Sequence, residues 1–164
     1  MKQAKIMPLE KPAGNPAPKF EFLPIQPVQL GRVWPLVAPG VAECLEGGRG
    51  EASPESVLRD LATGGKLLWL GLSGEKLVGF AVTQVVPGNF WSELLLYLVW
   101  IAPHAGGDFL KDGLPTFEEY GRSVGCKRVV FYSAREKTRS GKAFSRRVEE
   151  IGFKPHYVEY VKEI

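Results

Sequence analysis

Three strand-sized apolar segments, joined by very short connections, constrain the fold of this chain most. They cover residues 66–72, 76–86 and 90–102, with turn-forming residues at 73–75 and 87–89. Such tight connections join antiparallel neighbours, because parallel strands need a long crossover. Residues 94–101 are apolar at both alternating sets of positions, which indicates a central strand covered on both faces. The sequence therefore predicts an antiparallel meander at the centre of a layered domain.

Helices and further strands surround this meander. Residues 20–25 alternate and contain Pro24, which favours an edge strand. Residues 28–45 carry apolar side chains at helical steps, but Pro35 and Pro39 predict a break into two short helical pieces. Ser53 followed by Pro54 is typical of a helix start. Further helices are expected over 115–124 and 140–151, and further strands over 127–133 and 157–161.

The first part of the chain differs from the rest in composition. Residues 1–19 contain four prolines and few large apolar side chains, so they cannot bury enough surface to offset their ordering entropy. A chain of 164 residues fits one domain. We expect an extended Pro-rich arm over residues 1–19 and one folded domain over residues 20–164.

Composition excludes several classes of protein. No run approaches the ~20 apolar residues of a membrane-spanning helix, and no apolar core follows Lys2 and Lys5 as in a secretory signal. Cys44 and Cys126 have no metal-site or disulfide-framework spacing. A formal net charge of +3 is too small to imply a nucleic-acid partner. We therefore expect a cytoplasmic protein with free thiols, no metal and no membrane partner.

The element order resembles that of the GNAT (GCN5-related N-acetyltransferase) superfamily. The resemblance rests on the meander, on the apolar strand that ends in Trp100-Ile101-Ala102-Pro103, on the glycine-bearing loop and helix that follow, and on the terminal Gly152-Phe153 turn. It implies an α+β fold with α/β/α layers. Its mostly antiparallel sheet would have about six strands and would splay open between strands four and five.

In this family acyl-coenzyme A lies in the opening between those two strands. The resemblance implies that backbone at the end of the fourth strand holds the pantetheine chain, and that the following loop and helix start hold the diphosphate. Glycines and free N–H groups at a helix start suit such an anion. The residues implied are Ile101, Ala102 and Pro103 for pantetheine, and Gly106, Gly107 and Lys111 for the diphosphate of acetyl-CoA.

The diphosphate loop departs from the family pattern. Ala105 takes the place of the usual basic residue, and Asp108 and Leu110 take places where glycine is usual. Asp108 and Asp112 add negative charge where the diphosphate would lie, and Pro115 predicts a late helix start. The acetyl-CoA loop is therefore degenerate.

The family's general acid is a tyrosine on the last helix, and its position here is Val148. Valine cannot donate a proton to a departing thiolate. Tyr132 is the candidate substitute, with Ser145 and Glu149 as alternatives nearby in sequence.

Glu93, near the start of the central strand, is the candidate general base, and His104 at its end is the second choice. A general base must reach the incoming amine at hydrogen-bond distance. Both residues also have a purely structural interpretation, Glu93 as a solvent-facing residue at a strand start and His104 as a surface loop residue.

A narrower resemblance is to small GNAT-like proteins of tailed bacteriophages, through Val33-Trp34-Pro35, the Ser53-Pro54 helix start and an arginine-rich last helix. It implies a virion, assembly or partner-binding protein with weak or no acetyltransferase activity, located in the host cytoplasm or in a virion. The arm over residues 1–19 would then dock on viral structural or host proteins. The alternative is an active acetyl-CoA-dependent N-acetyltransferase that acts on a small amine or a protein.

Overall fold

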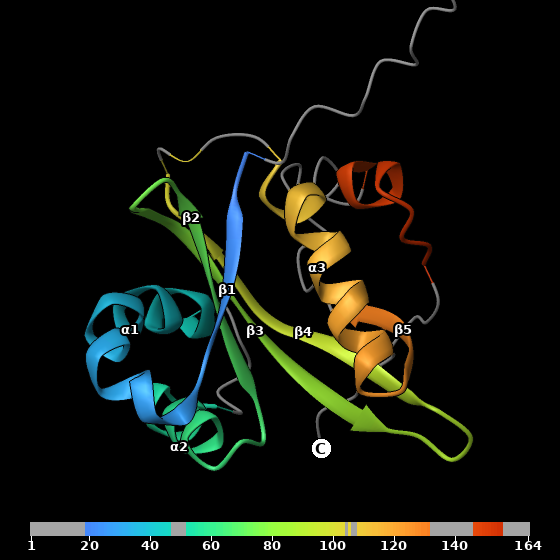
Figure 1. The fold of residues 1–164 in the computed structure, drawn as a ribbon, viewed down its shortest axis with the longest axis horizontal. Coiled ribbons are helices and arrows are strands. Elements are labelled where there is room, and N and C mark those ends of the chain that lie inside the picture. The colour runs from blue at the N-terminus through green and yellow to red at the C-terminus, as the bar shows by residue number, and fades with distance from the viewer. Residues whose placement is uncertain (1–18, 47–51, 104, 106–107, 132–145, 156–164) are drawn as a thin grey trace, which may run out of the picture.

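The computed structural model describes residues 19–46, 52–103, 105, 108–131 and 146–155. Among these residues, one sheet lies between two helices on one face and a long helix on the other, and a short helix at residues 146–150 lies near the long one (Figure 1). The layered α+β class expected from the sequence is confirmed. Within these ranges no helix combines the length and the apolarity that crossing a bilayer requires.

Among the described residues the sheet has five strands, in the order β1-β2-β3-β4-β5. The first four pair antiparallel with their neighbours, and β5 runs parallel to β4. The predicted meander and edge strand are thus confirmed, while the strand predicted over 157–161 lies outside the described residues. The strands are β1 (Glu21–Ile25), β2 (Leu67–Ser73), β3 (Lys76–Pro87), β4 (Ser92–Ile101) and β5 (Cys126–Phe131).

The short 3-10 helix η1 (Pro27–Gln29) leads into α1 (Leu30–Glu46), which is one continuous helix, so the predicted break at Pro35 and Pro39 is wrong. Both prolines lie on the exposed side of α1, where water can solvate the carbonyl groups that lose their N–H partners. The opposite side buries Leu30, Val37 and Val41. At about 1.5–3 kcal/mol for each buried side chain, this packing offsets the ~3 kcal/mol typical of one interior proline.

Helix α2 (Pro54–Ala62) begins where the sequence predicts. The Ser53 hydroxyl accepts a hydrogen bond from the Ser56 N–H at 3.2 Å, and the Ser56 hydroxyl accepts one from the Ser53 N–H at 3.0 Å. Two backbone donors at the helix start are therefore satisfied reciprocally. Residues 146–150 are helical, in agreement with the second half of the helix predicted over 140–151, and the first part lies outside the described residues.

Helix α3 (Phe109–Ser123) begins before Pro115, so the late start predicted from that proline is wrong. Pro115 lies inside the helix on its exposed surface, and fully buried Phe109 anchors the first turn instead. The Phe109 ring packs on the sheet at two glycines: an added Cβ would lie 2.2 Å from the ring at Gly71 and 2.7 Å from it at Gly79. Tertiary packing therefore sets the start of this helix.

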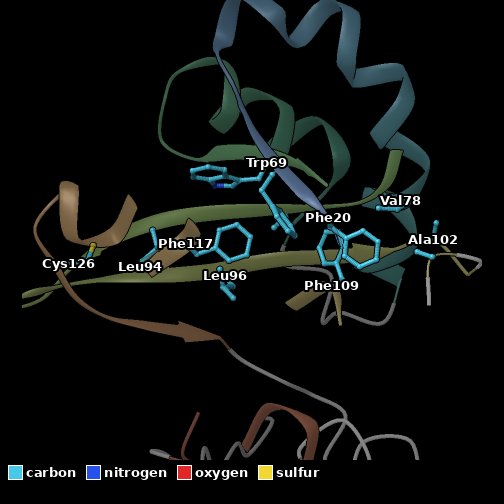
Figure 2. Close-up of a cluster of buried hydrophobic side chains, with 12 residues drawn as sticks. Phe20, Trp69, Val78, Leu94, Leu96, Ala102, Phe109, Phe117 and Cys126 are labelled. Atoms are coloured by element: carbon cyan, nitrogen blue, oxygen red, sulfur yellow. The ribbon is translucent and has the colours of Figure 1, made fainter. Parts of the chain in front are cut away.

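Two hydrophobic clusters fill the spaces between the layers. The cluster between the sheet and α3 is rich in aromatic side chains and runs along the sheet from Ala102 to Cys126 (Figure 2). The Phe22 and Phe109 rings meet edge to face there at 4.8 Å. The cluster under α1 and α2 is mostly aliphatic around Phe80. Together they hold the helices on both faces of β4, the strand that carries the candidate site.

Candidate functional site

The candidate site lies where the described pairing of β4 with β5 ends. Their parallel pairing runs from Ser92 opposite Cys126 to Leu96 opposite Phe131 and goes no further within the described ranges. β4 itself continues to Ile101 and stays paired with β3 over that length. Its second half therefore has a strand on one side and, among the described residues, an open edge on the other. The described residues agree with the opening expected between the fourth and fifth strands, although β5 is described only as far as Phe131.

A β-bulge coincides with the end of this pairing. Val82 lies opposite Leu98 and Thr83 lies opposite Leu96, so Tyr97 is an extra residue on β4. A bulge bends its strand and increases the local twist. Tyr97 and Leu98 consequently both pack against the cluster under α1 and α2. The bend redirects β4 directly after Leu96, the last residue for which a pair with β5 is described.

The open edge presents backbone groups of β4. The Ala102 N–H donates a hydrogen bond of 2.9 Å to the Val78 carbonyl, toward β3. Since successive residues of an extended chain direct their backbone groups to alternate sides, those of Ile101 and Val99 face the opening. Of the three predicted pantetheine residues, Ile101 thus lies at the open edge, Ala102 uses its N–H within the sheet, and Pro103 has no N–H.

The last turns of α1 form a wall beside this edge. An added Cβ on Gly40 would lie 2.7 Å from Phe80 and 2.8 Å from Trp100, so the glycine permits a very close approach of helix and sheet. The Cys44 Sγ lies 3.6 Å from the Val99 carbonyl oxygen, and the Trp100 Nε1 donates a hydrogen bond of 2.8 Å to Glu43 Oε2. Glu43 and Cys44 were not among the predicted site residues, although a glycine on the apolar side of a predicted helix could have indicated the close contact.

The first turn of α3 lies beyond the end of β4. Lys111 is exposed there, as a phosphate ligand must be. The Asp112 carboxylate accepts a hydrogen bond of 2.8 Å from the backbone N–H of Lys19, so part of the acidity of this turn serves to hold the start of the domain. The Asp108 side chain makes no capping hydrogen bond. The predicted residues Gly106 and Gly107, and the alternative base His104, lie outside the described residues.

Glu93 lies in the paired half of β4, three residues before Leu96, or about 10 Å along the strand. Arg128, its partner on β5, donates from Nε to Glu93 Oε1 at 2.6 Å, and Arg128 Nη2 also contacts Oε1. Within the described part of the chain, Glu93 Oε2 has no hydrogen-bond donor. The arrangement is compatible with both interpretations of Glu93, and its role as a base stays a prediction.

The position of the family's tyrosine is buried. Val148 is 7% exposed, and its carbonyl accepts a hydrogen bond of 3.1 Å from the Phe153 N–H. Glu149, an alternative acid, is exposed, as are Arg146 and Arg147 beside it. Tyr132 and Ser145 lie outside the described residues, so the candidate acid stays a prediction.

Comparison with known proteins gives matches at the level of structure. No family model and no curated protein matches the sequence. An aminoglycoside acetyltransferase from an uncultured soil metagenomic sample superposes with a TM-score of 0.67 at 9% identity, over 89% of this chain and 97% of that one. A ribosomal-protein-alanine N-acetyltransferase from Brucella melitensis biovar Abortus 2308 gives 0.63 at 14% identity, over 88% and 99%. The chain has the GNAT fold.

A third solved structure with this fold is the aminoglycoside N-acetyltransferase AAC(6')-Iy in complex with CoA. It superposes with a TM-score of 0.61 at 11% identity, over 88% of this chain and 94% of that one. Sequence identities in this range establish the fold alone. The resemblance to bacteriophage GNAT-like proteins stays a prediction.

Proposed function

We propose that this chain is an acetyl-coenzyme A-dependent N-acetyltransferase. The edge of β4 beyond the Tyr97 bulge, which has no partner strand among the described residues, carries the proposal. An extended ligand with amide groups, such as pantetheine, can pair with such an edge as an added strand does. The fold shared with a CoA complex gives further support.

The described residues of the opening fit the ligand. Ile101 is 39% exposed and offers backbone groups for pantetheine. Lys111 offers a positive charge for the diphosphate, and the neighbouring Asp112 carboxylate accepts a hydrogen bond from the backbone N–H of Lys19. Acetyl-CoA, when bound, supplies an activated acetyl thioester.

The residues of the chain would share the remaining tasks. The β4 edge would fix the thioester, and the wall formed by α1 would leave the acceptor amine to approach beside Glu43 and Cys44. Because Glu93 lies about 10 Å along β4 before the described pairing with β5 ends, its Oε2 would accept the proton of the attacking amine through intervening water, and Tyr132 would donate one to the departing thiolate. Fixing the two reactants together removes much of the entropic barrier to a bimolecular transfer.

Calorimetric titration with acetyl-CoA tests the binding step, and release of free thiol in the presence of amines tests the transfer. We expect micromolar binding that Gly107→Leu abolishes and that Lys111→Glu weakens about tenfold, through loss of a charge-assisted phosphate contact. Lys127→Glu, the same charge change on the exposed start of β5, is the matched control. Absence of heat at millimolar acetyl-CoA would exclude the proposal.

A second candidate function is partner binding on a GNAT scaffold that has little or no activity, as in a phage virion or assembly protein. The buried Val148 in place of the tyrosine acid and the acidic first turn of α3 favour it. Its docking element would be the arm over residues 1–19. Deletion of residues 1–18, which keeps Lys19 for its bond to Asp112, should abolish incorporation into the complex while the domain stays folded. Unchanged incorporation would exclude the arm as the docking element.

A further inference from the structure

The carboxylate of Glu43 is held in place although it lies on an exposed part of α1. The Trp100 indole N–H donates to its Oε2 at 2.8 Å, across 57 positions of sequence. Most exposed glutamates are mobile, because holding a long side chain costs conformational entropy. A hydrogen bond from an indole to a carboxylate is charge-assisted and is therefore stronger than a neutral one. Glu43 is a fixed negative charge.

Trp100 is itself rigidly supported. Its ring stacks on Phe80 with centroids 5.7 Å apart and an angle of 18° between the planes. Gly40, one turn before Glu43, brings α1 so close that an added Cβ would lie 2.8 Å from the Trp100 ring. The carboxylate is thus tied to the open half of β4 through a packed aromatic pair.

Glu43 also lies beside the opening. Its neighbour Cys44 contacts the carbonyl of Val99, one of the residues whose backbone groups face the open edge. An acceptor that approaches β4 from the α1 side passes these two side chains. Among the described residues nothing donates to Oε1 of Glu43, so this oxygen can take a hydrogen bond from a ligand.

We propose that Glu43 binds a second positive charge on the acceptor amine, an inference that rests on the proposed function. The nitrogen that attacks a thioester must be neutral, and Glu93 is already its proposed proton acceptor, so the fixed charge of Glu43 is left for a separate charged group. A separate ammonium or guanidinium group on the same molecule pairs with it instead. The substrate class is therefore a cationic amine with at least two basic groups, whether a small diamine or a lysine-bearing peptide.

Equilibrium binding in the presence of coenzyme A tests this without requiring turnover. The probes are 1,4-diaminobutane against butylamine, and a capped dilysine peptide against its single-lysine counterpart. We expect the wild type to bind the doubly charged probe of one pair about fivefold more tightly, as for an exposed ion pair of up to ~1 kcal/mol. The pair that shows the larger ratio identifies the source of the second charge.

Glu43→Gln keeps an acceptor oxygen for Trp100 and removes the charge, so it should reduce this ratio to about one and leave the singly charged probes unaffected. Glu46→Gln, the same change three residues later on α1, is the control and should keep the wild-type ratio. The proposal is overturned if the wild type shows no preference in either pair, or if the preference survives in Glu43→Gln. Glu43-dependent binding without acetyl transfer would exclude the transferase and keep the cation site.

Discussion

Arg128 on β5 and Glu93 on β4 face each other across the parallel pairing and form an ion pair on one carboxylate oxygen, Oε1. The Arg128 guanidinium also lies 5.9 Å from the centroid of the Trp91 ring. The ion pair ties the two strands together near the start of their described pairing. Since it uses one oxygen of Glu93, structural and chemical roles for this residue are compatible.

The first prediction separates these two roles. If Glu93 Oε2 is the general base, Glu93→Gln should lower kcat for acetyl transfer about 10²–10⁴-fold. The same change weakens a partly buried ion pair and should reduce the free energy of unfolding by about 1 kcal/mol. Steady-state kinetics and urea denaturation measure the two effects separately.

Arg128→Gln is the matched control, because it breaks the same ion pair and leaves the carboxylate. It should reproduce the loss of stability with a much smaller loss of kcat. Equal rates in the wild type and Glu93→Gln would assign Glu93 to the stability of the sheet alone.

The second prediction concerns the close contact of α1 with the sheet. Gly40→Ala puts a methyl group 2.7 Å from Phe80 and 2.8 Å from Trp100, and such overpacking should lower the free energy of unfolding by about 1–3 kcal/mol. Gly31→Ala in the same helix has nothing within 4 Å of its added Cβ and should be neutral or stabilise by up to ~1 kcal/mol. Urea denaturation checks this: the unfolding midpoint of Gly40→Ala should lie below that of the wild type, and the midpoint of Gly31→Ala should equal or exceed it.

The third prediction tests the anchor of α3. Phe109 is 0% exposed, so Phe109→Ala should cost about 3–5 kcal/mol of unfolding free energy. It should also weaken acetyl-CoA binding, since the first turn of α3 would lose its support on the sheet. Phe90→Ala is the control, because Phe90 is 90% exposed and its removal should change stability by less than about 0.5 kcal/mol. A small effect at Phe109 would mean that other residues fix the helix start.

Strand positions followed from the sequence because alternation and turn residues are local signals. The meander and the Ser53 cap were predicted on this basis and are present. The helix break predicted from Pro35 and Pro39 and the late helix start predicted from Pro115 were wrong. A prediction from proline alone counts the lost hydrogen bond and leaves out the burial of Val41 or Phe109, which offsets that loss.

Within the site, the position of the opening and the place of Ile101 beside it were predicted from the resemblance of the element order to a known fold. The pairing of Glu43 with Trp100 joins residues 57 positions apart and depends on how closely Gly40 lets α1 approach. No local sequence pattern gives the distance between α1 and the sheet. Contacts of this kind between distant elements are what sequence analysis could not supply here.

The fourth prediction concerns stability at alkaline pH. Burial raises the pKa of the Cys126 thiol, and the negative charge of Glu93 raises this pKa further. Burial likewise raises the pKa of Tyr120, with a smaller contribution from Cys126. In both cases the folded state retains the proton at pH values where the unfolded chain loses it. The free energy of unfolding should therefore be constant below the unfolded thiol pKa of about 8.5 and should decrease as the pH rises beyond it.

Each group can contribute a slope of at most about 1.4 kcal/mol per pH unit. Urea denaturation between pH 7 and pH 11 measures this slope. Cys126→Ala should flatten the curve between pH 8 and pH 10, and Tyr120→Phe should flatten it at higher pH, because each variant removes one proton that the folded state retains. Glu93→Gln should also flatten the first region in part, since it removes the charge that helps to keep the thiol protonated. A curve for Cys126→Ala parallel to that of the wild type would show that the thiol titrates alike in both states, against the burial seen for this side chain.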